Sequence, residues 1–308
     1  MNNLPHPIQY QGSKRNLASS ILVYVPEDVD CLIEPFAGSA AISIAVAARK
    51  IARTYIINDI NKPLTELLRL IIESPVETAT FYENIWSEQH GNSINSIEHY
   101  YKIREIFNNT QDPRLFLYLL ARCVKGSVRY NSNGEFNQSP DKRRNGTKPK
   151  TMLRNILGVS SLLKGRTEVC SLDYRNVLMN AKDNDLVYMD PPYQGVCGDH
   201  NPRYFSGIHH YDFIDTLADL NVRGISYIVS YDGRRAEKRF GEQLPQSLDL
   251  THIELEAGRS SQSTLLGREE VTYESLYLSR ALTDRIGSKL LTYCRTRTKQ
   301  RPSLELFT

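Results

Sequence analysis

Apolar residues follow two different patterns along this chain of 308 residues. Within residues 1–61 and 165–280, short continuous apolar runs end abruptly at small or polar residues, which is typical of buried parallel strands. From Lys62 to about Val124, apolar residues recur every three to four positions instead, as they do along one face of a helix. The two patterns predict an α/β protein whose parallel sheet is interrupted by a mainly helical segment.

The first two predicted strands end at candidates for ligand binding. Cys31–Glu34 runs into a turn of small residues, and a helix is predicted from 41 to about 49. This is the build of a nucleotide-binding βα unit, but the turn contains one glycine, Gly38, and lacks the three-glycine dinucleotide fingerprint of NAD enzymes. Asp59 ends the second strand, 21 residues after Gly38, where an acid accepts hydrogen bonds from ribose hydroxyls. The pair indicates an adenosine-containing ligand; a plain tight turn is the alternative.

The strand predicted over Leu186–Met189 stops at Asp190-Pro191-Pro192-Tyr193. Because proline lacks an N–H and fixes its own φ, the strand cannot continue, and a rigid corner follows at its carboxyl end. The corner offers a planar amine two acceptors, the Asp190 carboxylate and the Pro191 carbonyl, and the Tyr193 ring can stack on a base. A strand end followed by a polyproline turn without chemistry is the alternative.

Near the amino terminus, Gly12-Ser13-Lys14 precedes a helix predicted over residues 16–24, so Lys14 lies near a helix start. A lysine in this position can hold an anion or the carboxylate of a ligand. A solvated loop lysine is the alternative.

Basic residues are concentrated between Arg122 and Arg166, a segment that contains eleven lysines and arginines but only two acidic residues. Within this segment, residues 128–137 are predicted to form a hairpin that turns at Asn133-Gly134. A basic hairpin with aromatic side chains suits a phosphate backbone and base edges, so nucleic acid is the predicted partner, with a charged solvated loop as the alternative. The candidate contacts are Lys125, Arg129, Tyr130, Asn131, Asn137, Lys142, Arg143 and Arg144.

The rest of the chain continues the strand pattern after a polar loop at 194–208, which is predicted to be a mobile lid. The further predicted elements are a helix over 212–222, strands over 225–230, 250–256 and 273–279, a basic loop over 258–268, and a basic tail over 281–308.

Composition narrows the function classes only slightly. The formal net charge of +3 is too small to identify a polyanion partner by itself. The five cysteines are scattered, and neither they nor the seven histidines have metal-ligand spacing, so we expect no metal site and a reducing, cytoplasmic compartment. The sequence predicts neither a signal peptide nor a membrane-spanning run.

Taken in order, these motifs resemble those of the Dam-like, alpha-group adenine-N6 DNA methyltransferases over residues 8–279. The segments that carry the resemblance are Tyr10-Gln11-Gly12-Ser13-Lys14, Glu34-Pro35-Phe36-Ala37-Gly38-Ser39-Ala40, Asn58-Asp59-Ile60-Asn61, Arg129-Tyr130-Asn131 with Gly134-Glu135-Phe136-Asn137, and Asp190-Pro191-Pro192-Tyr193. Two positions depart from the family pattern. Ala40 replaces the second glycine of the cofactor motif, and Ser13 stands where many relatives have glycine.

The resemblance implies a Rossmann-like methyltransferase sheet that binds S-adenosylmethionine and releases S-adenosylhomocysteine. It implies a catalytic domain of residues 1–61 and 165–280 and an inserted, mainly helical target-recognition domain of residues 62–164, with 281–308 as a tail. The implied cofactor-binding residues are Tyr10, Gly12, Lys14, Glu34, Pro35, Phe36, Ala37, Gly38, Ser39, Ala40, Asp59, Ile60 and Asp190. The implied catalytic residues are Asp190, Pro191, Pro192 and Tyr193.

Duplex DNA with a flipped adenine is the implied substrate, and Arg129 matches the family position that reads a guanine edge. We expect a monomer in the cytoplasm of a bacterial, phage-infected or archaeal cell, associated with the nucleoid. The recognition sequence and a cognate restriction endonuclease are left open. Three alternatives stay open as well: methyl transfer to adenine in RNA, methyl transfer to cytosine N4, and a non-catalytic DNA-binding module of the same fold.

Overall fold

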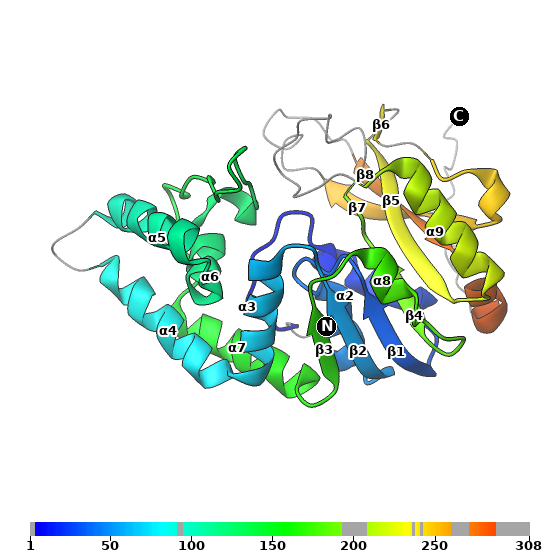
Figure 1. Cartoon of the computed structure of the whole chain (residues 1–308), viewed down its shortest axis with the longest axis horizontal. Coiled ribbons are helices and arrows are strands. Elements are labelled where there is room, and N and C mark those ends of the chain that lie inside the picture. The colour runs from blue at the N-terminus through cyan, green and yellow to red at the C-terminus, as the bar shows by residue number, and fades with distance from the viewer. Residues whose placement is uncertain are drawn as a thin grey trace, which may run out of the picture.

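The computed structural model describes residues 4–90, 95–192, 208–235, 238–240, 243–259 and 271–287. Its centre is a mixed β-sheet with helices on both faces (Figure 1). The strands are β1 (Val29–Glu34), β2 (Ala52–Asn58), β3 (Thr167–Cys170), β4 (Leu186–Met189), β5 (Tyr227–Arg235), β6 (Lys238–Phe240), β7 (Thr251–Arg259) and β8 (Val271–Leu278). The predicted α/β class is confirmed, but the sheet is not wholly parallel, because β6, β7 and β8 pair antiparallel.

The strand order β3-β2-β1-β4-β5-β8-β7 reverses direction between β1 and β4. The chain moves outward from β1 through β2 to β3, and it then returns to the other side of β1 for β4 and β5. Leu32 lies opposite Leu186 in a parallel pair, and Ile33 lies opposite Val187, so the carboxyl ends of β1 and β4 are neighbours. Ligands of open α/β sheets bind at such a reversal.

Alternate residues of the central strands face opposite sides of the sheet. Leu32 and Tyr188 join the core that includes helix α2 (Ala41–Ala48), whereas Ile33 and Val187 join the core that includes α8 (Tyr174–Leu178) and α9 (His210–Val222). All four side chains are almost fully buried, and burying one of this size contributes roughly 1.5–3 kcal/mol. Two covered faces explain why these strands are apolar throughout.

In the described part of the chain, five α-helices separate β2 from β3 and stand to one side of the sheet in Figure 1. They are α3 (Lys62–Glu73), α4 (Pro75–Glu88), α5 (Ser96–Thr110), α6 (Pro113–Arg122) and α7 (Pro149–Leu163). Four of them have a proline in the first turn, where its missing N–H is not needed. Their apolar side chains continue the core cluster that includes α2, so the helical segment and the sheet share one core.

Two predicted elements differ in extent from the observed ones. The helix predicted over residues 16–24 consists of α1 (Ala18–Ile21) between two 3-10 turns, η1 (Lys14–Asn16) and η2 (Leu22–Tyr24). Strand β5 does not stop at 230 but continues to Arg235, because β8 pairs with it again beyond a register shift.

The predicted hairpin is present in a short form, with one antiparallel bridge between Tyr130 and Phe136 in place of extended strands. The Asn137 N–H donates to the Arg129 carbonyl, and at the turn the Gly134 N–H donates to the Asn131 carbonyl, both at 3.0 Å. Gly134 has φ +76°, a left-handed conformation that glycine adopts without strain. The predictions for Tyr193, for the lid up to 207, for the basic loop from 260 and for the tail beyond 287 lie outside the described residues.

Candidate active site

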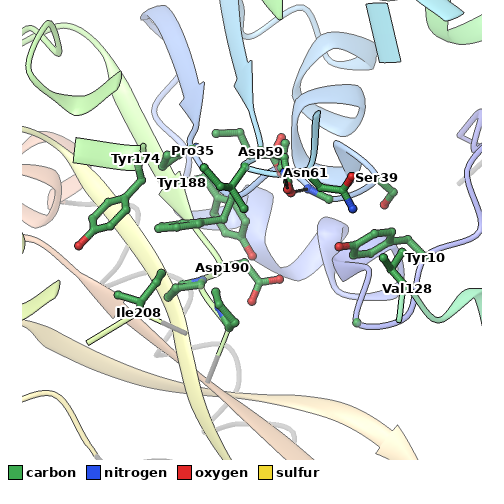
Figure 2. A pocket seen from close by; sticks show the side chains of 18 of the residues that line it. Tyr10, Pro35, Ser39, Asp59, Asn61, Val128, Tyr174, Tyr188, Asp190 and Ile208 are labelled. Atoms are coloured by element: carbon green, nitrogen blue, oxygen red, sulfur yellow. Dashed lines mark hydrogen bonds between the residues drawn. The ribbon is translucent and has the colours of Figure 1, made fainter. Parts of the chain in front are cut away.

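A cavity of about 270 Å³ lies at the carboxyl ends of β1, β2 and β4. Figure 2 shows Asp190, Asp59 and Tyr10 around the same space, although they follow β4, follow β2 and precede η1 respectively. Every residue predicted to bind the cofactor lines the cavity except Ala40, and Pro191 and Pro192 line it as well. The reversal of strand order therefore brings the separate sequence motifs to one place.

The Asp59 carboxylate joins the turn after β1 to the turn after β2. Its Oδ2 accepts the Gly38 N–H at 2.9 Å, and its Oδ1 accepts the Asn61 N–H at 2.9 Å. Burial raises the pKa of Asp59, while these two backbone N–H groups act in the opposite direction. A carboxylate oxygen accepts more than one hydrogen bond, so Asp59 can shape the turns and still accept from a ligand.

The two departures from the family pattern have different structural consequences. Ala40 adopts φ +54° and ψ +36°, a left-handed conformation that costs an L-residue about 1 kcal/mol or more. This position is therefore one where glycine is favoured, and alanine keeps the same backbone. Ser13 has φ −54°, which needs no glycine, and its Oγ lies 2.8 Å from the Ser39 Oγ. Serine at position 13 links the amino-terminal motif to the turn after β1.

The amino-terminal motif is held against the cavity from two sides. The Gln11 N–H donates to the Gly126 carbonyl at 2.9 Å, which ties the motif to the segment after α6. A Cβ added at Gly38 would lie 3.0 Å from the Tyr10 ring, and Gly38 has φ +51°. The ring therefore packs directly on the backbone of the turn, and position 38 has no room for a side chain.

Lys14 lies buried between the carboxylates of two residues that are far apart in the sequence. Its Nζ lies 2.8 Å from both oxygens of Asp190 and 3.2 Å from Oε2 of Glu274 on β8. The Ser230 hydroxyl donates to the same Glu274 oxygen at 3.3 Å. The Lys14 side chain is 7% exposed, and those of Asp190 and Glu274 are 21% and 25% exposed. The sequence predicted that Lys14 would hold an anion, and here the anions are two carboxylates of the protein itself.

Glu34 faces the start of α2 and is 2% exposed. Its Oε2 accepts both the backbone N–H and the hydroxyl of Ser43, at 3.0 and 2.5 Å. Burial raises the pKa of Glu34 to about 7 in spite of these hydrogen bonds. Glu34 lines the cavity while its Oε2 is engaged with α2, and its predicted contact with the cofactor stays a prediction.

We expect Glu34→Gln to raise the free energy of unfolding at neutral and alkaline pH. Between the ordinary pKa of 4.5 and the folded value of about 7, the folded chain binds a proton that the unfolded chain has released, so stability falls as pH rises through this window. Glutamine keeps the acceptor for Ser43 and does not ionise. The substitution therefore removes a loss of up to about 3 kcal/mol in the free energy of unfolding. Urea unfolding of both proteins from pH 5 to 8 measures the difference, and parallel pH profiles would contradict it.

The predicted nucleic-acid contacts gather on the segment between α6 and α7. The side chains of Lys125, Arg129, Asn137, Lys142, Arg143 and Arg144 are exposed. Asn131 is half-buried, and its Oδ1 accepts the N–H groups of Asn133 and Glu135. Asn131 therefore holds the tight turn together in this structure.

Two residues of the basic segment are buried instead of exposed. Tyr130 is 7% exposed, and its hydroxyl accepts a hydrogen bond from Asn61 Nδ2 at 3.1 Å. Burial raises the pKa of Tyr130 to about 12. Its side chain lies in the cavity wall, and its predicted contact with DNA stays a prediction. Arg122 is 1% exposed, so it does not contribute to the basic surface that the count of charges suggested.

Some cavity residues were not identified from the sequence. The loop after β3 contributes Leu172, Asp173 and Tyr174, and the Tyr174 and Phe36 ring centroids lie 5.0 Å apart. Asp173 caps α8 by accepting the Arg175 N–H. The rule that identified Asp59, a carboxylate just after a parallel strand, also applies to Asp173. Glu274 lies within a strand and has no comparable local signal.

Other kinds of site are not evident in the described residues. No group of three histidine, cysteine, aspartate or glutamate side chains there is arranged to hold a metal ion. Likewise, the helices in that part of the chain lack the length and apolarity that crossing a bilayer requires.

Comparison with known proteins points to one family. A family model described as D12 class N6 adenine-specific DNA methyltransferase matches residues 10–260. The chain is 24% identical over 274 residues to the type II methyltransferase M.FokI of Planomicrobium okeanokoites, covering 86% of this chain but 41% of that protein. It is 29% identical over 232 residues to the DNA adenine methylase of Serratia marcescens, covering 74% of this chain and 79% of that protein.

Two further similarities are weaker, one because a smaller share of the chain is aligned and the other because the structures superpose poorly. The DNA adenine methylase of Escherichia coli strain K12 is 29% identical over 190 residues, which are 60% of this chain and 64% of that protein. A solved rRNA methylase from Streptococcus thermophilus covers 87% of this chain, but the TM-score is 0.35 and the identity 8%, which is too low to support an argument.

Proposed function

The chain belongs to the D12 class N6 adenine-specific DNA methyltransferase family, and on this premise we propose that it transfers a methyl group from S-adenosylmethionine to N6 of an adenine flipped out of duplex DNA. One observation carries the proposal. Asp190, followed by Pro191 and Pro192, lines the same cavity as the Gly38 turn and Asp59. An acceptor for an amine thus lies beside a turn suited to an adenosine-containing cofactor.

The residues that line the cavity offer polar and apolar groups suited to S-adenosylmethionine. Gly38 lines the cavity without a side chain of its own, and the Tyr10 ring packs beside it, so backbone and an aromatic ring form the wall there. Asp59 supplies acceptors for ribose hydroxyls, and Ile60 and Leu172, about half exposed, offer apolar surface for an adenine ring. We assign cofactor contacts to Tyr10, to the turn from Phe36 to Ala40 and to these residues. When bound, S-adenosylmethionine supplies an electrophilic methyl group.

We expect Gly38→Ala to weaken cofactor binding about tenfold, because the new methyl group pushes the Tyr10 ring out of place and strains φ +51°. Gly165→Ala is the matched control, since Gly165 also has positive φ but has open space around its Cα. Isothermal titration calorimetry with S-adenosylmethionine compares the two variants. Equal dissociation constants for both variants would show that crowding at position 38 does not matter.

The chain's own groups would act on the target amine in three ways. The adenine N6 lone pair is delocalised into the ring, which makes it a poor nucleophile. Hydrogen bonds from N6 to the Asp190 carboxylate and the Pro191 carbonyl pull the nitrogen towards tetrahedral geometry and stabilise the positive charge that develops on it. Tyr193, which lies outside the described residues, is assigned the stacking position that its motif implies. By fixing the position of N6 in the cavity, these groups would supply much of the rate.

Residues 62–164 are the proposed target-recognition part, and duplex DNA is the proposed substrate. The exposed basic side chains between α6 and α7 support this assignment. Arg129 is exposed, and its guanidinium forms no ion pair or hydrogen bond within the described residues, so it is available for a bidentate contact with guanine. No recognition sequence follows from these features.

Expressing the chain in a methylation-deficient bacterium and mapping modified bases by long-read sequencing tests the proposal. We expect N6-methyladenine at one short, recurring site. Digesting the DNA to nucleosides for mass spectrometry distinguishes N6-methyladenine from N4-methylcytosine. Unmodified DNA in cells that contain folded protein, or methylation confined to cytosine or to RNA, would refute the proposed function.

A further inference from the structure

The segment between α6 and α7 contains a short basic loop, defined here as residues 141–147. Its side chains Lys142, Arg143 and Arg144 are exposed, and Arg144 makes a loose ion pair with Asp141 at 3.5 Å. Three consecutive exposed cations are usually a solvated stretch of chain. In this protein, however, the backbone of the loop is held by donor side chains of the helices, three of them buried and one half-buried.

Arg122, at the end of α6, is the residue around which the loop backbone is arranged. Its side chain is 1% exposed, and its Nη1 donates to the carbonyls of Asp141, at 3.0 Å, and Arg144. Its own carbonyl accepts the Asp141 N–H at 2.7 Å. Gly146 has φ +81°, and a Cβ there would lie 3.1 Å from the Arg122 side chain. The loop is therefore wrapped around a buried guanidinium, whose weak hydration suits it to carbonyl partners.

Helix α4 and the residue after it hold the other half of the loop. The Tyr82 hydroxyl donates to the Thr147 carbonyl at 2.6 Å. Trp86 Nε1 and Gln89 Nε2 both donate to the Asn145 carbonyl, at 2.8 and 3.1 Å. Gln89 is itself held, because its Oε1 accepts the Tyr118 hydroxyl at 3.2 Å. Four of the seven carbonyls of the basic loop thus have side-chain donors from the helices.

This arrangement fixes the loop before any partner arrives. A free loop would lose roughly 1–2 kcal/mol of conformational free energy per residue on binding, whereas here ordering is completed when the chain folds. Preorganisation of this kind strengthens binding by lowering its entropic cost. The backbone positions that carry the outward cations are then fixed relative to one another, which suits the regularly spaced charges of a duplex backbone.

We propose that the basic loop is a preorganised clamp for the phosphate backbone of duplex DNA, with Arg122, Tyr82, Trp86 and Gln89 as its positioning residues. The inference rests on the proposed function for the identity of the partner. It adds that the helix donors, which carry no net charge except for Arg122, determine how tightly the exposed cations bind.

The test compares a variant that loses donors to the loop backbone, called the fastening variant, with a variant that loses one charge of the loop. The fastening variant is Tyr82→Phe/Trp86→Phe/Gln89→Met, which removes the three α4-side donors and leaves every loop cation in place. The charge variant is Arg143→Ala. The control is Arg53→Gln, which removes an 84% exposed cation at the start of β2. This position is at the amino end of the strand, whereas the cavity lies at the carboxyl ends. Fluorescence anisotropy with a random-sequence 30-base-pair duplex, without cofactor, gives the dissociation constant from 50 to 300 mM NaCl.

We expect the fastening variant to bind about five- to tenfold more weakly with an unchanged slope of log affinity against log salt. Tyr82→Phe alone is expected to weaken binding about two- to threefold, which keeps the test valid if the triple variant does not fold. The charge variant should lower the slope by about 0.9, one phosphate contact. The control should match the wild type.

Wild-type affinity of the folded fastening variants would overturn the positioning role, and so would a slope reduced as far as in the charge variant. An unchanged slope for Arg143→Ala would overturn the phosphate contact itself. Binding without cofactor is independent of methyl transfer, so failure of the clamp and failure of the proposed function give different results.

Discussion

Replacing Asp190 with asparagine is expected to lower the rate of methyl transfer by about a hundred- to a thousandfold, the loss seen when one preorganised electrostatic group is removed from an active site. The asparagine oxygen still accepts one hydrogen bond, but it carries no charge to stabilise a cationic N6. The asparagine NH2 group also points donors towards Lys14 Nζ or the target amine, which are donors themselves. Single-turnover transfer of a tritiated methyl group to DNA that carries the mapped site measures the change.

Binding measurements separate this loss from simple misfolding. Calorimetry with S-adenosylmethionine and anisotropy with DNA should give dissociation constants close to those of the wild type, because Asp59, the Gly38 turn and the basic surface are unchanged. Asp215→Asn is the matched control, since it makes the same substitution at an exposed position of α9 outside the cavity. Near-normal methylation by the Asp190 variant would remove this residue from the mechanism.

Much of the candidate site could be predicted because its signals are local. Asp59 and Asp190 each follow directly after an apolar strand, and Gly38 lies in a turn between a strand and a helix. Carboxyl ends of neighbouring parallel strands meet at one edge of the sheet. Motifs far apart in sequence therefore converge once the strands are recognised, and no knowledge of side-chain contacts is needed.

The features that were missed depend on contacts between distant residues. Lys14 and Asp190 are 176 positions apart, and Glu274 reaches them from an antiparallel strand that no local pattern connects to η1. Counting charges also placed Arg122 on the basic surface, although it is buried. A sequence does not reveal whether a guanidinium finds carbonyl partners inside the protein. The burial of Tyr130 was not predicted for a similar reason, since its hydroxyl pairs with Asn61, which lies at the start of α3 and far away in sequence.

The Lys14–Asp190–Glu274 cluster leads to the second large effect that we expect. Lys14→Met removes the cation that separates two carboxylates, and breaking a buried ion pair in this way typically costs 3–5 kcal/mol. Water reaches Asp190 and Glu274 in part, since they are 21% and 25% exposed, so we expect a smaller cost of about 2–3 kcal/mol. Applied to the transition state, in which Asp190 acts, this free energy corresponds to a loss of rate of about thirty- to a hundred-and-fiftyfold. Glu274→Gln alone leaves Lys14 paired with Asp190 and should cost only about two- to fivefold.

The double variant Lys14→Met/Glu274→Gln decides between a positioning role and general destabilisation. If Lys14 acts by offsetting the repulsion between the two carboxylates, removing the Glu274 charge as well should restore part of the lost rate, and the double variant should be faster than Lys14→Met. If Lys14 instead acts directly on substrate or cofactor, the two losses should multiply. Thermal unfolding of all three variants, measured beside the single-turnover rates, shows whether a lower rate merely follows a lower stability. A double variant slower than Lys14→Met at equal stability would therefore refute the positioning role of this cluster.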